Sequence, residues 1–230
     1  MPLTSPTLHY IYDPLCGWCY GAAPLLEAAH RLGTLRIVLH GGGMLAGSKR
    51  RRVTPAFRDF VIPIDQRIHR LTGQPFGPDY IDGLLCDSDA VLDSAPPITA
   101  ILAAEEINGS GIEMLHRLQH AHYVEGLRIS DFPVLQAISQ EQGLPGAQFL
   151  LVYTNIDLRT TRQHIRASRR LLTTVGGTGF PAFVLESPQG EYSQLDSGPF
   201  LGRVDAWTEH LMAKLAVGLP SPDGQMSLSN

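Results

Sequence analysis

The sequence has no excess of basic residues and no long apolar run. Eighteen Lys and Arg residues stand against 22 Asp and Glu residues, which leaves a formal net charge of −4. Nucleic-acid-binding domains are usually clearly basic, so this balance argues against a nucleic-acid partner. The apolar stretches fall short of the roughly 18 residues that a membrane-spanning helix requires. We therefore expect neither a nucleic acid nor a membrane among the partners.

The amino terminus lacks the features of a secretory signal, and cysteine is scarce. Residues 1–14 have no basic start and no apolar segment ending in a small-residue cleavage site. We therefore expect the protein in the reducing cytoplasm, where structural disulfides are rare. The sequence contains three cysteines, Cys16, Cys19 and Cys86. In that compartment, a close pair of thiols is more often catalytic or metal-bound than structural.

The first forty residues predict a β-α-β unit. The apolar and aromatic run Leu8–Tyr12, bounded by Asp13-Pro14, predicts a buried strand. Helical spacing of apolar residues predicts a helix over Cys16–Leu32, and a second strand is expected over Leu35–Leu39. The unit has the length of a parallel crossover, so the chain opens as an α/β domain. Gly41–Gly43 is expected to be a flexible exit from the second strand.

Helical patterns dominate the middle of the chain, and strand patterns return near its end. The expected helices of the middle block are Thr54–Leu71, Pro97–Ile107, Ile112–Glu125, Phe132–Gln142 and Asp157–Thr173. A hairpin of Pro181–Glu186 and Tyr192–Leu195 and a helix over Arg203–Val217 are expected to follow. We therefore predict an α/β domain made of residues 1–45 and 175–218. A helical domain over 46–174 interrupts it, and residues 219–230 are expected to form a flexible tail.

Cys16-Gly17-Trp18-Cys19 lies where the first strand passes into the first helix. Residues three apart in a first helical turn share one face, so the two sulfurs can close a disulfide. The first sulfur lies beside unpaired N–H groups at the positive end of the helix dipole, which stabilise an exposed thiolate by roughly 0.3–1 kcal/mol. We therefore expect Cys16 to ionise readily and to attack a substrate disulfide. Cys19, one turn inside the helix, is expected to resolve the mixed disulfide.

Several segments together resemble the DsbA family of thioredoxin-fold thiol-disulfide oxidoreductases. They are YIYDPLCGWCYG, the helical insertion between two halves of an α/β domain, HAHYVEGLRISDFPVL within that insertion, and TGFPAF. The chain is most similar to the cytoplasmic branch of candidate protein-disulfide isomerases, relatives of the FrnE-type proteins. The resemblance implies a thioredoxin fold with a large all-helical insertion. It also implies a disulfide oxidoreductase or isomerase that acts through its own dithiol, without a metal or further cofactor.

The partners implied by this resemblance are a protein or small-molecule disulfide substrate and a cellular thiol reductant. The resemblance further implies that Pro181 is the family's cis-proline and faces the cysteine pair. Pro181 would remove an N–H next to the sulfurs, while Phe180 would expose its backbone to an extended substrate peptide. Without the family, a trans bond is the default, because about 5–6% of X–Pro bonds in folded proteins are cis. Trp18 either faces the substrate or packs over the helix start.

One position departs from the family pattern. Many members carry a buried acid six residues before the first cysteine, where this chain has Tyr10. The nearest acid is Asp13. It either moves the proton to and from Cys19 or only shapes the turn with Pro14.

Other functions remain open. The kappa-class glutathione transferases and hydroxychromene-carboxylate isomerases use glutathione as cosubstrate on a related fold, but they usually carry serine at the position of Cys16. The chain is alternatively a peptide-binding module whose thiols are incidental or bind zinc. Further zinc ligands would come from Cys86 or from His116, His120 and His122, although such histidines more often form a solvated helix face.

Two features outside the cysteine pair each have a structural and a functional interpretation. Cys86 is expected to be a small buried apolar residue, and less often a regulatory thiol. The basic run Lys49–Arg52 is expected in a loop, either as solvated surface or as a contact for a phosphate or a glutathione carboxylate.

Overall fold

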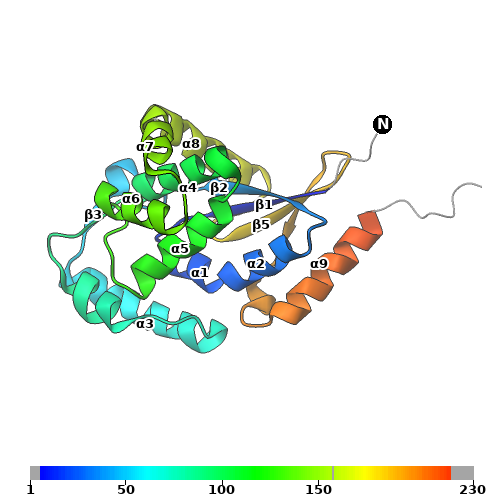
Figure 1. The fold of residues 1–230 in the computed structure, drawn as a ribbon. Coiled ribbons are helices and arrows are strands. Elements are labelled where there is room, and N and C mark those ends of the chain that lie inside the picture. Colours follow the sequence, from blue (N-terminus) through cyan, green and yellow to red (C-terminus); the bar gives the residue numbers. More distant parts are fainter. Residues whose placement is uncertain (1–5, 157, 219–230) are drawn as a thin grey trace, which may run out of the picture.

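A four-stranded mixed sheet lies at the centre of the computed structural model, which describes residues 6–156 and 158–218 (Figure 1). Its strands are β1 (Thr7–Tyr12), β2 (Arg36–Gly41), β5 (Ala182–Glu186) and β6 (Tyr192–Leu195), in the order β2-β1-β5-β6. β1 and β2 are parallel, whereas β5 is antiparallel to both β1 and β6. The sheet therefore joins strands from the two ends of the chain.

Helices cover both faces of this sheet, which explains why every residue of β1 is buried. Successive side chains of a strand point to opposite faces. Tyr10 packs on one face against Phe183, with ring centroids 4.7 Å apart. Ile11 packs on the other face against Leu172 of α8 (Leu158–Thr174).

The single helix expected over residues 16–32 is wrong, because the structure has two. They are α1 (Gly17–Gly21) and α2 (Ala23–Arg31). The break at Ala22 precedes Pro24, a residue that fits the first turn of a helix but not its interior. The last helix, α9 (Val204–Gly218), packs beside α2, where the Trp207 indole N–H donates to the Leu25 carbonyl at 3.0 Å.

The helical block lies between β2 and β5, as predicted. In the described part of the chain, its helices are α3 (Pro55–Thr72), α4 (Ala95–Asn108), α5 (Gly111–Tyr123), α6 (Phe132–Glu141), α7 (Gly146–Asn155) and α8. α4 contacts α5, α6, α7 and α8 and is buried along most of its length (Figure 1). The exact boundaries of the two domains stay a prediction, and the expected tail over 219–230 lies outside the described residues.

Sequence patterns missed several short elements. α7 was not predicted, because Leu150 and Leu151 on it are exposed and blur its apolar face. The loop expected over Lys49–Arg52 is wrong at its end, where β3 (Arg51–Arg52) pairs with β4 (Val91–Leu92). Short helical turns also occur at Gly47–Lys49, Asp79–Gly83, Leu84–Cys86 and Gly198–Phe200. Within the described residues, each helix is too short or too polar to cross a bilayer.

Candidate functional site

The cysteine pair lies where β1 passes into α1, as the sequence predicts. Cys16 has extended backbone angles, φ −98° and ψ 113°, and α1 begins at the next residue. The Cys16 N–H donates to the Asp13 carbonyl at 3.2 Å, and the Tyr20 N–H donates to the Cys16 carbonyl at 3.1 Å. These bonds place Cys16 at the start of the helix and Cys19 one turn further on.

Cys16 and Cys19 are free thiols that differ in burial. Cys19 is fully buried, and Cys16 is 6% exposed, so Cys16 is less open than we expected of an attacking thiol. Its side chain lines a cavity. Burial, followed by hydrogen bonding with Cys16, raises the pKa of Cys19 well above its ordinary value. Cys19 therefore stays protonated at neutral pH in the dithiol form.

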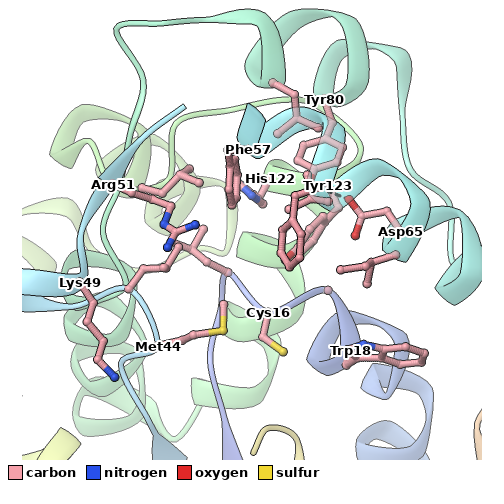
Figure 2. Close-up of a pocket in the computed structure, with 18 of the residues that line it drawn as sticks. Cys16, Trp18, Met44, Lys49, Arg51, Phe57, Asp65, Tyr80, His122 and Tyr123 are labelled. Atoms are coloured by element: carbon pink, nitrogen blue, oxygen red, sulfur yellow. Dashed lines mark hydrogen bonds between the residues drawn. The ribbon is translucent and has the colours of Figure 1, made fainter. Parts of the chain in front are cut away.

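The cavity beside Cys16 has a volume of about 700 Å³ and lies between the β1–α1 junction and the helical block. Figure 2 shows the basic side chains of Lys49 and Arg51 on one side of it and Asp65 and Tyr123 on the other. Its wall also includes Trp18, Met44, Phe57, Tyr80 and His122. Small-molecule sites usually measure about 300–1,000 Å³ and combine an apolar wall with a few polar groups. The cavity therefore has the size and lining of a site for a small charged molecule.

The Phe180–Pro181 segment lies against Cys16 as well. The peptide bond between these two residues is cis, as the resemblance implies. The Cys16 thiol donates to the Phe180 carbonyl at 3.7 Å. Trp18, Phe180 and Pro181 line a second hollow of about 520 Å³. The structure thus brings together Cys16, Cys19, Trp18, Phe180 and Pro181, the five residues that the sequence analysis placed in the site.

The loop after β2 supports the Phe180 side chain, and α8 holds this loop in place. The Arg169 guanidinium donates to the carbonyls of Gly42 and Gly43 at 2.7 and 2.6 Å, and the Gly41 N–H donates to His164 at 2.9 Å. A Cβ atom on Gly42 would lie 2.1 Å from the Phe180 ring. The expectation of a flexible exit is therefore wrong, and sequence spacing contained no signal for these long-range bonds.

The Asp13 carboxylate is fully buried beneath the site and connects three segments. It accepts hydrogen bonds from the Leu15 N–H at 2.9 Å, from the Ser94 hydroxyl at 2.9 Å and from the Met44 N–H. Burial raises its pKa to about 6 although these bonds lower it. Asp13 therefore shapes the turn, and its backbone N–H also donates to the Cys19 sulfur at 3.4 Å. A role in proton transfer stays a prediction.

Tyr10 occupies the position at which the family usually has an acid. Its hydroxyl donates to the Cys19 carbonyl at 3.2 Å. Burial raises its pKa well above the ordinary value for tyrosine, so Tyr10 remains a neutral donor.

A second buried acid, Asp65 on α3, was not predicted. It is 6% exposed and accepts a hydrogen bond from the Tyr80 hydroxyl at 2.9 Å. Burial raises its pKa to about 7. A Cβ atom on Gly17 would lie 2.9 Å from Asp65 Oδ1, so the carboxyl group lies directly over the turn that carries Cys16. One sequence signal could have identified Asp65. It lies three residues before Ile68, so both side chains share the buried face of this helix.

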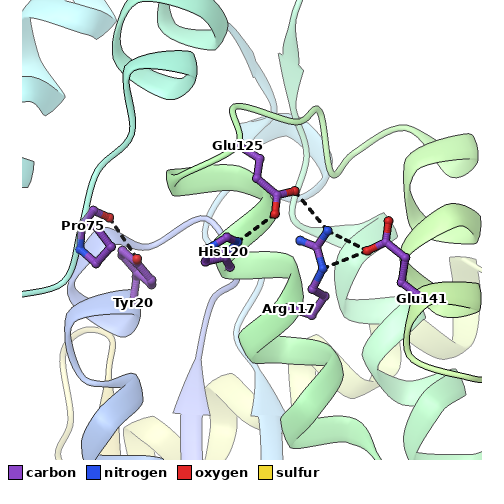
Figure 3. Close-up of polar contacts among 6 residues, drawn as sticks. All are labelled: Tyr20, Pro75, Arg117, His120, Glu125 and Glu141. Carbon is purple, nitrogen blue, oxygen red and sulfur yellow. Dashed lines mark hydrogen bonds and ion pairs between the residues drawn. The ribbon is translucent and has the colours of Figure 1, made fainter.

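The histidines of α5 have separate surroundings. His120 lies 2.9 Å from Glu125, which also accepts from Arg117 at 3.0 Å, and Arg117 reaches Glu141 at 2.7 Å (Figure 3). Across residues 6–156 and 158–218, no three His, Cys, Asp or Glu side chains group as a metal ion would require. Cys86 is exposed, so the expectation of a buried residue is wrong.

Comparisons with known proteins identify similar solved structures. Scans of family models and of curated proteins give no match. The cytosolic disulfide reductase DsbM from Pseudomonas aeruginosa is 50% identical, with a TM-score of 0.86, over 92% of this chain and 99% of that one. Its structure with GSH is 49% identical, with a TM-score of 0.85, over 91% and 99% of the two chains.

A structure from Nitrosomonas europaea, described as a candidate protein disulfide isomerase, is also similar. It is 22% identical, with a TM-score of 0.75, over 93% of this chain and 98% of that one. At this identity the likeness concerns the fold alone.

Proposed function

Because this chain belongs to the DsbA family of thioredoxin-fold thiol-disulfide oxidoreductases, we propose that it reduces disulfides in the cytoplasm and that glutathione or a similar thiol recycles it. The predicted fold class, a thioredoxin fold with a helical insertion, is confirmed, and the chain is a disulfide oxidoreductase or isomerase. One observation carries the site that we propose, and the likeness to a cytosolic disulfide reductase supports the direction. A free dithiol lies between the Phe180 carbonyl and a cavity of glutathione size, in a chain half identical to a cytosolic disulfide reductase.

The first step is attack by the Cys16 thiolate on one sulfur of a substrate disulfide. A bond forms between Cys16 and that sulfur, the substrate S–S bond breaks, and the other substrate sulfur leaves with the electron pair and takes up a proton. Cys19 then loses its proton and attacks the Cys16 sulfur, which releases the second substrate thiol. The substrate gains two electrons, and the enzyme is left with a Cys16–Cys19 disulfide.

Cys19 suits the resolving step because of its burial. Its raised pKa keeps it protonated until a mixed disulfide has formed, so it does not compete with Cys16 for the substrate. Asp13 is the acid nearest to it in the turn, with its own N–H on the Cys19 sulfur. We assign the acceptance of the Cys19 proton to this carboxylate.

The second hollow is suited to an extended substrate segment. Phe180 presents backbone beside Cys16, and Pro181 has no N–H that would compete for the sulfur. Extended peptides commonly bind through backbone hydrogen bonds of this kind. We therefore place substrate at Trp18, Phe180 and Pro181.

The cavity on the other side of Cys16 is suited to the reducing thiol. Glutathione has two carboxylates, and Lys49, Arg50 and Arg51 at the cavity supply cationic donors of the kind that bind carboxylates. The basic run Lys49–Arg52 was expected either as solvated surface or as a contact for a phosphate or a glutathione carboxylate. It is exposed, and its first three residues line this cavity. The dithiol itself is then the only redox group that the reaction needs.

Reduction of insulin by glutathione tests the proposed function. Cys16→Ser is expected to abolish catalysis, and Cys19→Ser is expected to accumulate a mixed disulfide. Cys86→Ser is the matched control and should retain the activity of the unchanged protein. Equal activity in all three variants would refute the proposal. Conjugation of glutathione to a model electrophile, without disulfide reduction, would instead indicate a transferase, and zinc bound to the reduced protein would indicate the metal-binding alternative.

A further inference from the structure

The cavity beside Cys16 also contains a buried carboxyl group, that of Asp65, whose pKa burial raises to about 7. This inference rests on the proposed function. The oxidised enzyme must be reduced by an incoming thiol, and a thiol reacts only as the thiolate. A base at the point of entry therefore accelerates this half of the cycle. We propose that Asp65 accepts the proton of the thiol that enters the cavity to reduce the Cys16–Cys19 disulfide.

The position of Asp65 supports this assignment. Its side chain lines the same cavity as Cys16, and its Oδ1 atom lies over Gly17, the residue that follows Cys16. Tyr80 binds the other oxygen, Oδ2, at 2.9 Å and orients the carboxyl group. In the part of the chain that the structure describes, the hydrogen bond to this carboxyl group is on Oδ2, and no donor to Oδ1 is seen. One oxygen is therefore fixed, and the other is left for a ligand.

Other titratable groups surround Asp65. Those that line the cavity are Lys49, Arg50, Arg51, Tyr80, His122, Tyr123 and Cys16, which is part of the disulfide in the oxidised enzyme. His69 and Arg70 line a smaller hollow that Asp65 also borders but Cys16 does not. Burial lowers the pKa of His122 to about 4, so it is a weak base. Burial raises the pKa of Tyr80 and Tyr123, so both stay protonated. The cations of the basic run lie at the exposed mouth and have no free lone pair.

The chemistry balances without a further reactant. The entering thiol gives its proton to the Asp65 carboxylate, and the thiolate attacks the Cys16 sulfur. A bond forms between the two sulfurs, the Cys16–Cys19 bond breaks, and Cys19 leaves with the electron pair and takes up a proton. A second thiol loses its proton and attacks the first at the mixed disulfide, and Cys16 leaves with the electron pair and takes up a proton. Two thiols are oxidised to one disulfide, and the enzyme returns to the dithiol.

The decisive test compares thiols of different acidity on the Asp65→Asn variant. The oxidised protein is reduced under single-turnover conditions with 2-mercaptoethanol and with trifluoroethanethiol, which are similar in size but differ in acidity. Asp65→Asn is expected to slow reduction by glutathione and 2-mercaptoethanol about 100-fold, at the low end of general-base effects. The same substitution should slow reduction by trifluoroethanethiol, the more acidic thiol, far less. The ratio of two rates on one variant does not depend on how much of it folds.

Two further variants complete the test. Asp59→Asn removes an exposed acid on the same helix and should leave both rates unchanged. Tyr80→Phe removes the hydrogen bond that lowers the pKa of Asp65, so the acid limb of the pH–rate profile should move to higher pH. Two results would overturn the role of Asp65. One is an equal loss of rate with both thiols in Asp65→Asn, and the other is an unchanged pH–rate profile in both Asp65→Asn and Tyr80→Phe. If glutathione fails to reduce the unchanged protein, the proposed function itself fails.

Discussion

At the scale of single residues, burial determines the properties of the groups around the dithiol. It keeps Cys19 protonated, raises the pKa of Asp13 to about 6 and that of Asp65 to about 7, and lowers that of His122 to about 4. The motif Cys16-Gly17-Trp18-Cys19 was predictable because its chemistry depends on two local features, the spacing of the cysteines and their place at the start of a helix. Asp65 was not, because its burial arises only when α3 packs against the turn at Gly17.

The buried Asp65 also predicts how stability depends on pH. Its pKa is higher in the folded state, so its contribution to stability is complete below the ordinary value of 3.8 and is lost as pH rises through about 7. The rise of this pKa from 3.8 to about 7 corresponds to at most about 4 kcal/mol in the free energy of unfolding. Asp65→Asn, which keeps an acceptor for Tyr80, is expected to match the unchanged protein at pH 4 and to exceed its stability at pH 8. Urea unfolding at both pH values measures this difference, with Asp59→Asn as the control. The same change at both pH values would contradict it.

At the scale of elements, local sequence patterns predicted the strands and most helices. They did not predict the contacts between segments that lie far apart in the sequence. α3, α4, α5 and α6 were predicted to within two residues because they are long and have apolar residues at helical spacing. The division of the first helix followed from Pro24 and was overlooked. The loop after β2 was misjudged because its order comes from Arg169 and His164, more than a hundred residues away.

This loop supports a prediction about Gly42. A Cβ atom there would lie 2.1 Å from the Phe180 ring, so Gly42→Ala forces the ring or the loop to move. Overpacking of this kind costs about 1–3 kcal/mol. We expect lower stability in urea and slower insulin reduction, because Phe180 lies against Cys16. Gly83→Ala, where a Cβ atom meets open space, is the control. If Gly42→Ala and Gly83→Ala behave alike, Phe180 is not held by this loop.

At the scale of the whole molecule, the site is assembled from both parts of the chain. The sheet-bearing part supplies the dithiol and the Phe180–Pro181 segment, and the helical block supplies Asp65, Tyr80 and the wall of the cavity. The family resemblance predicted this division of the chain, but no pattern in the sequence indicated that the helical block closes over Cys16. In the function that we propose, the insertion is therefore part of the reaction site as well as part of the fold.

The central claim is that Cys16 exchanges disulfides through this cavity while Cys19 resolves them. The most direct measurement is peptide mass spectrometry of the Cys16→Ser and Cys19→Ser variants after mixing with oxidised glutathione. We predict that Cys19→Ser carries glutathione on Cys16 and that Cys16→Ser carries none on Cys19, because that thiol is buried and protonated. Glutathione on Cys19, or its absence from Cys16 in Cys19→Ser, would contradict the account.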